Sequence, residues 1–179
     1  MSDGNLGSAR LLVFRVGTLA CAAEVDLVRE ILPRLPTTRI PGAPSVVAGL
    51  VNIRGTLVTV VEGWRALGQE TPPVRPSADL PTDQDPDAQG STIILELGRD
   101  GDNGERRLIG VTVDAVMDML AGGDVTLEDR QGLPGVDPTL VRAVGRRNGQ
   151  LFIVLDVAAL LGPILTTQGA SGEPHGSGL

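Results

Sequence analysis

The sequence predicts an all-β protein built of two small closed barrels, with only short helical turns between the strands. The apolar runs are short, about five to seven residues each, and glycine, proline or asparagine-glycine turns bound most of them. A pair of segments recurs in the same order in the two halves of the chain. A duplicated unit of about five short strands suits a barrel, because closure removes most exposed sheet edges.

The duplication is visible in two pairs of segments. Residues 149–162 (GQLFIVLDVAALLG) lie over residues 55–68 (GTLVTVVEGWRALG) without a gap, with glycine at both ends of each segment. Residues 113–120 (VDAVMDML) lie over residues 25–32 (VDLVREIL), with an acidic residue at the same place. Because both pairs keep the same order, we interpret the chain as two copies of one unit that differ mainly in loop length.

The first elements form a hairpin and a proline-rich connection. Residues 10–16 and 19–23 are expected to be strands joined by a turn at Gly17-Thr18. Residues 24–28 suit a single helical turn. Residues 33–44 contain several prolines and must therefore be extended or looped.

A second hairpin follows and is the most informative stretch of the chain. Its two apolar runs, residues 47–53 and 57–61, meet at Arg54-Gly55, where glycine can take a positive φ at little cost. This turn leaves the side chains of Asn52 and Arg54 near a strand end, where they can reach a partner.

The middle of the chain changes composition. A short helical turn is expected at residues 64–67, with Gly68 as its C-cap. Residues 69–90 then carry five prolines and four aspartates, which predicts a solvated acidic loop without a core of its own. This loop is either a tolerated insertion or a regulatory acidic segment.

The second half repeats the strand-rich pattern. Asn148-Gly149 is a strong signal for a type I′ hairpin turn, residues 122–138 are expected to be loop with one turn near 126–130, and residues 156–161 form the last helical turn. Residues 1–9 and the glycine-rich residues 166–179 are expected to be disordered tails. The strands of this half are predicted at residues 92–97, 107–113, 116–120, 139–144 and 151–155.

Composition and charge exclude several classes of function. The net charge of −7 argues against nucleic-acid binding, which requires clustered positive charge. No apolar run approaches the ~20 residues of a membrane span, so no membrane insertion is expected. The N-terminus lacks the features of a signal peptide, and cytoplasm is the default location. The single cysteine, Cys21, cannot form an internal disulfide and is interpreted as a small buried hydrophobe.

The chain offers few groups for catalysis. Its one histidine, His175, lies in the glycine-rich tail, and one cysteine with one histidine cannot build a structural zinc site. No nucleotide-binding glycine motif occurs, and no cofactor is expected. An enzyme on a small-barrel scaffold remains a remote alternative. A carboxylate metal site is conceivable, although a solvated acidic face is the simpler interpretation of its residues, Asp114, Asp118, Asp124 and Asp129.

A protein-binding surface is the favoured interpretation. Arg54 is the leading candidate, because arginine carries a fixed charge and five donors and is enriched at interface hot spots. The alternative is an exposed turn arginine that pairs with a local carboxylate. Glu30 is by default a solvated charge at a strand end, and Trp64 is expected to be partly buried core.

Several motifs in one order resemble the CheW-like domain of bacterial chemotaxis. The resemblance covers about residues 11–162 and includes the strand–NLRG–strand signature, here Asn52-Ile53-Arg54-Gly55. The other matching motifs are the segment Thr38 to Pro44, the turn Val28-Arg29-Glu30-Ile31, the turn Gly110 to Val116 and the closing Leu160-Leu161-Gly162.

The resemblance implies a single domain, residues 10–165, of two intertwined five-stranded SH3-like barrels with a hydrophobic groove between them. The first barrel would span about residues 19–68, and the second about residues 92–162 plus the N-terminal strand. It also implies a non-catalytic adaptor between the cytoplasmic tip of methyl-accepting chemoreceptors and the regulatory domain of a CheA-type histidine kinase. Carried over by position, Val28, Glu30, Gly49 and Arg54 would be among the contact residues, and Asn52, near the same turn, is added as a protein-binding candidate.

One stretch departs from the family pattern. After the second central strand the family usually reads P-φ-φ-D-L-R, whereas this chain has Thr59-Val60-Val61-Glu62-Gly63-Trp64, with Arg65 one place late. A divergent accessory adaptor, which binds only the receptor or only the kinase, is therefore the second interpretation within the family.

Overall fold

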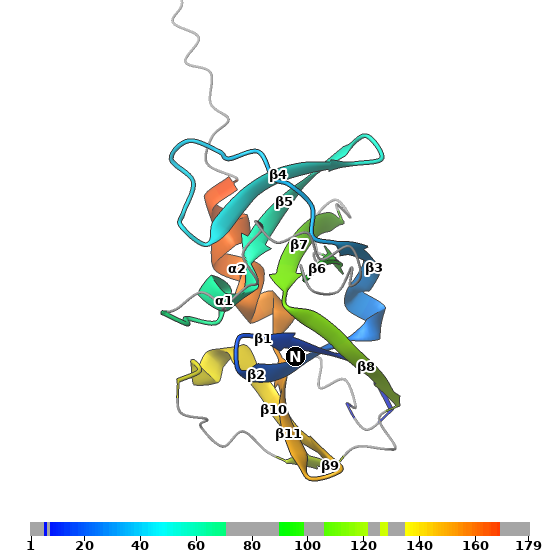
Figure 1. Cartoon of the computed structure of the whole chain (residues 1–179). Helices are drawn as coiled ribbons and strands as arrows, with labels where there is room; N and C mark the ends of the chain where they lie inside the picture. Colours follow the sequence, from blue (N-terminus) through cyan, green and yellow to red (C-terminus); the bar gives the residue numbers. More distant parts are fainter. Residues whose placement is uncertain are drawn as a thin grey trace, which may run out of the picture.

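Two β-sheets form two lobes that lie one above the other in Figure 1, as expected for an all-β, two-barrel fold. The structure is a computed structural model that describes residues 6, 8–70, 90–98, 106–121, 126–128 and 135–168. The expected acidic loop therefore lies almost entirely outside the described residues, as do most of the two expected tails. We name the five-stranded lobe, β3 to β7, lobe 1 and the six-stranded lobe lobe 2.

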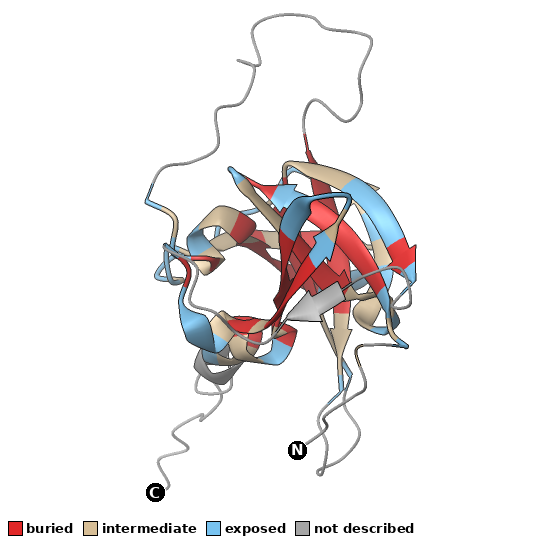
Figure 2. Ribbon diagram, turned by 90° about the horizontal axis from the view of Figure 1, so that it is seen from below, coloured by how far each residue is buried: buried red, intermediate tan, exposed pale blue. Residues whose placement is uncertain are grey.

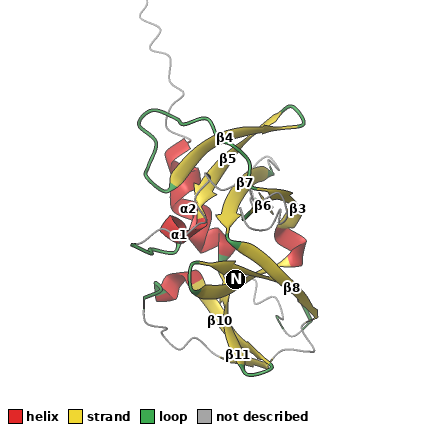
Figure 3. Ribbon diagram, viewed as in Figure 1, coloured by secondary structure: helices red, strands yellow, loops and turns green. Residues whose placement is uncertain are grey.

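The strands of lobe 1 are hydrogen-bonded in the order β3-β6-β7-β5-β4, and those of lobe 2 in the order β8-β1-β2-β11-β10-β9. Lobe 1 contains β3 (Val28–Pro33), β4 (Val47–Ile53), β5 (Thr56–Glu62), β6 (Ser91–Leu97) and β7 (Arg107–Val113). Lobe 2 contains β1 (Arg10–Val16), β2 (Leu19–Glu24), β8 (Ala115–Ala121), β9 (Thr126–Glu128), β10 (Val141–Arg147) and β11 (Gln150–Leu155). The helical segments are η1 (Val25–Leu27), α1 (Gly63–Ala66), η4 (Pro138–Leu140) and α2 (Val157–Gln168). Figure 3 shows these segments around the middle of the molecule.

The two repeats exchange their first hairpins. The β1–β2 hairpin lies between β8 and β11, and the β6–β7 hairpin lies between β3 and β5. The pairing is the same in both lobes, antiparallel on one side (β1 with β8, β3 with β6) and parallel on the other (β2 with β11, β5 with β7). Each lobe is thus completed by the hairpin of the other repeat.

This exchange differs from the expected division of the chain. Residues 19–68 do not delimit a barrel, because β2 lies in lobe 2 and lobe 1 takes β6 and β7 from the second half. The physical reason is local, since a tight turn with Gly17 at φ 60° holds β2 against β1 as one hairpin. A hairpin moves as a unit, so the two strands enter the same sheet.

Lobe 1 is closed by the segment that follows β3. In the described residues β3 and β4 are the two edges of the sheet, yet the backbones of Thr38 and Leu50 exchange two hydrogen bonds of 2.8 Å. Gly49 makes this approach possible, because a Cβ at this position would lie 2.3 Å from the carbonyl oxygen of Thr38. The sheet therefore rolls until the chain beyond one edge contacts the other edge.

The two equivalent hairpin turns have the same backbone geometry. Arg54 and Gly55 have φ of 50° and 86°, and Asn148 and Gly149 have φ of 50° and 80°. Two consecutive positive φ values define a type I′ turn, which matches the right-handed twist of the flanking strands. The type I′ prediction for Asn148-Gly149 is confirmed, whereas at the first turn Arg54 adopts a positive φ as well as the glycine.

The largest core cluster joins the two lobes and α2. It combines residues of β1 and β2 with residues of β6 and β7, and α2 contributes Leu160, Leu161 and Ile164. Figure 2 shows the buried residues concentrated on the inner strands. Separate smaller clusters fill the interior of lobe 2, around Phe152, and of lobe 1, around Val58.

Two element predictions are wrong. The last helical turn, expected to end at Leu161 and to give way to a tail from residue 166, is a helix that continues through Pro163 to Gln168. Burial of Leu161 and Ile164, 0% and 6% exposed, favours continuation over the proline penalty. The turn expected near residues 126–130 is instead the short strand β9, which pairs with β10.

Candidate protein-binding surface

Arg54 and Glu30, two residues singled out by the sequence, form an ion pair. The Arg54 Nη2 atom lies 3.1 Å from the Glu30 Oε2 atom. Arg54 is at the tip of the β4–β5 hairpin and Glu30 is on β3, at the other edge of the sheet, so rolling of the sheet brings them together. The expectation of a solvated Glu30 at a strand end is wrong, because Glu30 lies within β3 with its side chain only 21% exposed.

The pair leaves Arg54 available to a partner. Its side chain is 81% exposed, so the ion pair contributes little to stability, about 0–1 kcal/mol. The same contact restrains the guanidinium above the surface. Less side-chain conformational entropy is therefore lost when a partner binds. Arg54 is therefore an exposed turn arginine paired with a carboxylate, as the alternative interpretation expected, and also a positioned donor group.

The other three candidate residues support this surface. The Asn52 Oδ1 atom accepts a hydrogen bond of 2.8 Å from the backbone N–H of Gly55 and so stabilises the turn that carries Arg54. Gly49 is buried and permits closure of the sheet. Val28 is half-buried and packs against the main core cluster.

Lobe 2 contains an ion pair at a similar place, beside its own hairpin turn, which the sequence did not predict. Asp118 on β8 corresponds to Glu30 in the repeat, and its Oδ2 atom lies 2.5 Å from the Nη1 atom of Arg147. Arg147 ends β10, next to the type I′ turn of lobe 2. The alignment of the repeats gives only the acidic half of this pair, because it places Asp118 over Glu30 but Asn148, not Arg147, over Arg54.

Exposed apolar residues follow the same repeat. Leu57 and Leu151, 67% and 46% exposed, are equivalent positions near the start of β5 and β11. Ile31 and Met119, 41% and 54% exposed, are equivalent positions on β3 and β8. We name Glu30, Ile31, Arg54 and Leu57 the lobe-1 face, and Met117, Asp118, Met119, Arg147 and Leu151 the lobe-2 face. The sequence pattern does not reveal that these residues are exposed, because an apolar residue in a predicted strand is assigned to the core.

Four residues of the lobe-2 face, Met117, Asp118, Arg147 and Leu151, line a cavity of about 260 Å³. Val13, Leu120 and Phe152 give the cavity an apolar floor. Gly145 is needed here, because a Cβ at that position would lie 2.1 Å from the ring of Phe152. The remaining lining residues include both members of the ion pair and Met117 and Leu151, as well as Asn148 and Gln150. This combination of an apolar floor and a charged rim suits a protruding apolar side chain of a protein partner.

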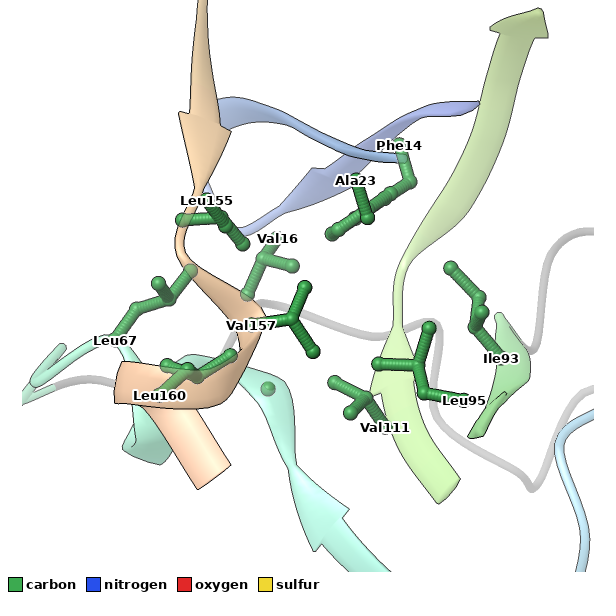
Figure 4. A pocket seen from close by; sticks show the side chains of 11 residues that line it. Phe14, Val16, Ala23, Leu67, Ile93, Leu95, Val111, Leu155, Val157 and Leu160 are labelled. Atoms are coloured by element: carbon green, nitrogen blue, oxygen red, sulfur yellow. The ribbon is translucent and has the colours of Figure 1, made fainter. Parts of the chain in front are cut away.

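A second cavity lies between the lobes and is too small for a ligand. It measures about 10 Å³, which is the space of about one water molecule. Figure 4 shows its apolar side chains converging from β1, β6, β7 and α2. It is lined by core residues alone, among them Phe14, Leu95, Val111 and Leu160. The junction of the lobes is therefore packed core at this point.

The stretch Glu62 to Arg65, which departs from the family pattern, contacts distant parts of the fold. Arg34 donates two hydrogen bonds to the Glu62 carboxylate, at 2.9 and 3.0 Å, and Thr112 donates a third of 2.9 Å. The Arg65 guanidinium lies 4.7 Å from the ring centre of Trp64 and donates to the carbonyl of Ser45 at 2.9 Å. Trp64 is partly buried against the main core cluster, as predicted.

The described residues contain no cluster of three or more potential metal ligands, and Asp114 instead accepts a hydrogen bond from the backbone N–H of Gly17. Burial raises the pKa of the Cys21 thiol to about 12. Asp124, Asp129 and His175 lie outside the described residues. None of the described helices has the length and apolarity to cross a membrane.

Comparison with known proteins identifies relatives along most of the chain. The family model of the CheW-like domain matches residues 10–164. A probable chemotaxis protein CheW of Rhizobium etli is 29% identical over 142 residues, covering 79% of this chain and 77% of that protein. The chemotaxis protein CheW of Rhizobium meliloti is 28% identical over 140 residues, covering 78% and 76%. The crystal structure of the scaffolding protein TtCheW of Thermoanaerobacter tengcongensis superposes with a TM-score of 0.65, at 17% identity, over 86% of this chain and 92% of that one.

Proposed function

The chain belongs to the CheW-like domain family, and we propose that it is a non-catalytic adaptor that couples methyl-accepting chemoreceptors to a CheA-type histidine kinase in a chemosensory pathway. Similarity to chemotaxis proteins over most of the chain supports the pathway. An adaptor of this kind would work in the cytoplasm, at receptor arrays on the inner face of the membrane.

The observation that carries the proposal is the repetition of one surface on two lobes. Coupling two proteins requires two binding surfaces, and the chain presents an acid–arginine pair with exposed apolar neighbours in each lobe. Exposed large apolar residues on a small domain mark interaction sites when they gather, and four of the five that the described residues contain occupy equivalent repeat positions.

We assign the two faces to different partners. The lobe-2 face has the cavity, three exposed apolar side chains and a polar rim, which suit a rigid barrel of the kinase regulatory domain. The lobe-1 face has the more exposed arginine, which suits polar and carboxylate groups on the helical tip of a receptor. Glu30 and Asn52 would hold Arg54 in place for that contact.

Separate binding measurements test the proposal. Titration calorimetry of the full chain with a receptor tip fragment, and independently with a kinase regulatory domain, is expected to give binding in both cases. Binding of one partner alone would favour the accessory adaptor, and binding of neither would refute the proposal. A matched pair of variants locates the receptor contact, because Arg54→Ala should weaken it whereas Arg106→Ala removes an equally exposed, ion-paired arginine of the same lobe.

A further inference from the structure

Both internal methionines of the chain lie on one edge strand of lobe 2. The sequence has three methionines, at positions 1, 117 and 119. Met117 and Met119 are 51% and 54% exposed, although methionine side chains are usually buried. Their thioether groups are therefore open to solutes in the free protein.

The register of β8 directs Met117 to the cavity. Val13 pairs with Asp118 and Phe14 with Val116, so Met117 is the extra residue of a β-bulge. It lines the cavity together with Asp118, whereas Met119 pairs with Leu12, outside the cavity lining. The two methionines thus flank the carboxylate of the lobe-2 ion pair.

The equivalent positions in lobe 1 cannot undergo the same chemistry. Met117 corresponds to Arg29 and Met119 to Ile31 in the aligned repeat. Neither an arginine nor an isoleucine side chain reacts readily with peroxides, so a change at sulfur would alter the lobe-2 face and leave the lobe-1 face intact.

We propose that Met117 and Met119 form a peroxide-sensitive modification site that switches off the lobe-2 face as a docking surface; the docking part of this inference depends on the function proposed above. In each event the thioether sulfur attacks one oxygen of a peroxide, an S–O bond forms and the O–O bond breaks. The sulfur loses two electrons, and the peroxide is reduced to water or an alcohol. The product is a sulfoxide, which reductases can return to the thioether.

Oxidation opposes docking because it changes a flexible apolar side chain into a polar one. A partner that covers the rim of the cavity would have to bury the sulfoxide oxygen away from water, which is unfavourable without a new hydrogen bond. Cys21 does not compete for the peroxide, because it is 0% exposed and its pKa of about 12 keeps it a thiol rather than the nucleophilic thiolate.

The test uses the full chain treated with hydrogen peroxide and mapped by peptide mass spectrometry. We expect the sulfoxide at both positions, kinase-domain affinity reduced about 10-fold, which is about 1.4 kcal/mol, and receptor-tip affinity unchanged. Methionine sulfoxide reductase should restore binding. The Met117→Leu/Met119→Leu variant should have the same kinase-domain affinity before and after peroxide treatment, because it has no thioether to oxidise, and Met117→Gln/Met119→Gln should bind weakly without peroxide.

Four outcomes separate the possibilities. Full oxidation at both positions with unchanged kinase-domain affinity overturns the inference alone, as does an equal loss in the peroxide-treated leucine variant. Slow oxidation of both positions relative to a methionine-containing peptide also overturns it. If the untreated protein binds no kinase domain, the proposed function fails, and the docking role of this face fails with it. Far-UV circular dichroism of each sample checks that the fold is retained.

Discussion

Gly49→Ala is expected to destabilise the protein by opening the seam that closes lobe 1. A Cβ at this position would lie 2.3 Å from the carbonyl oxygen and 2.8 Å from the carbonyl carbon of Thr38, and backbone atoms cannot move aside as a flexible side chain can. The variant would then lose the two backbone hydrogen bonds between Thr38 and Leu50 that close lobe 1. Each is worth about 0.5–1.5 kcal/mol.

Backbone strain adds to this loss. Gly49 has φ of 152°, a conformation that costs a residue with a Cβ about 1–3 kcal/mol. The expected total is therefore about 2–6 kcal/mol. Gly55→Ala is the matched control, because Gly55 has φ of 86° but a Cβ there would meet no atom within 4 Å. It should cost only about 1–2 kcal/mol.

Urea unfolding followed by the fluorescence of Trp64, the only tryptophan, measures both variants. The difference in the free energy of unfolding between the two variants isolates the clash from the strain. If Gly49→Ala costs no more than Gly55→Ala, the closure of lobe 1 through Thr38 and Leu50 is refuted.

Three further variants or measurements test separate parts of the structure. Arg54→Ala should weaken receptor-tip binding by about 1–3 kcal/mol with little change in melting temperature, and an equal loss for Arg106→Ala would contradict a specific contact. Arg34→Ala should lower the free energy of unfolding by about 1–3 kcal/mol, because it removes two hydrogen bonds from a Glu62 carboxylate only 20% exposed; an unchanged urea midpoint would contradict this. Cys21 should react with an aromatic disulfide reagent at pH 8 only after unfolding, because burial raises its pKa to about 12, and fast labelling of the native protein would show that lobe 2 opens.

The sequence predicted those features that depend on neighbours along the chain. Glycines 55 and 149 fixed the two equivalent turns, and the alternation of apolar residues located most strands. The type I′ turn could be predicted from Asn148-Gly149 alone, because this dipeptide favours positive φ at both positions.

Features that depend on contacts between segments distant in the sequence could not be predicted from local patterns. The exchange of hairpins depends on parallel pairing of β5 with β7 and of β2 with β11, for which no local pattern exists. The contact of Arg54 with Glu30 needs the sheet to roll first. The continuation of α2 through Pro163 depends on burial of Leu161 and Ile164 among residues of other elements.

One pair of variants can measure whether each face binds a different partner. Leu57→Asp and Leu151→Asp place the same charge at equivalent, exposed positions of the two lobes. We expect Leu151→Asp to abolish binding of the kinase regulatory domain and to spare the receptor tip, and Leu57→Asp to do the reverse. Equal effects of the two variants on both partners, or no effect of either, would contradict the assignment of one partner to each lobe.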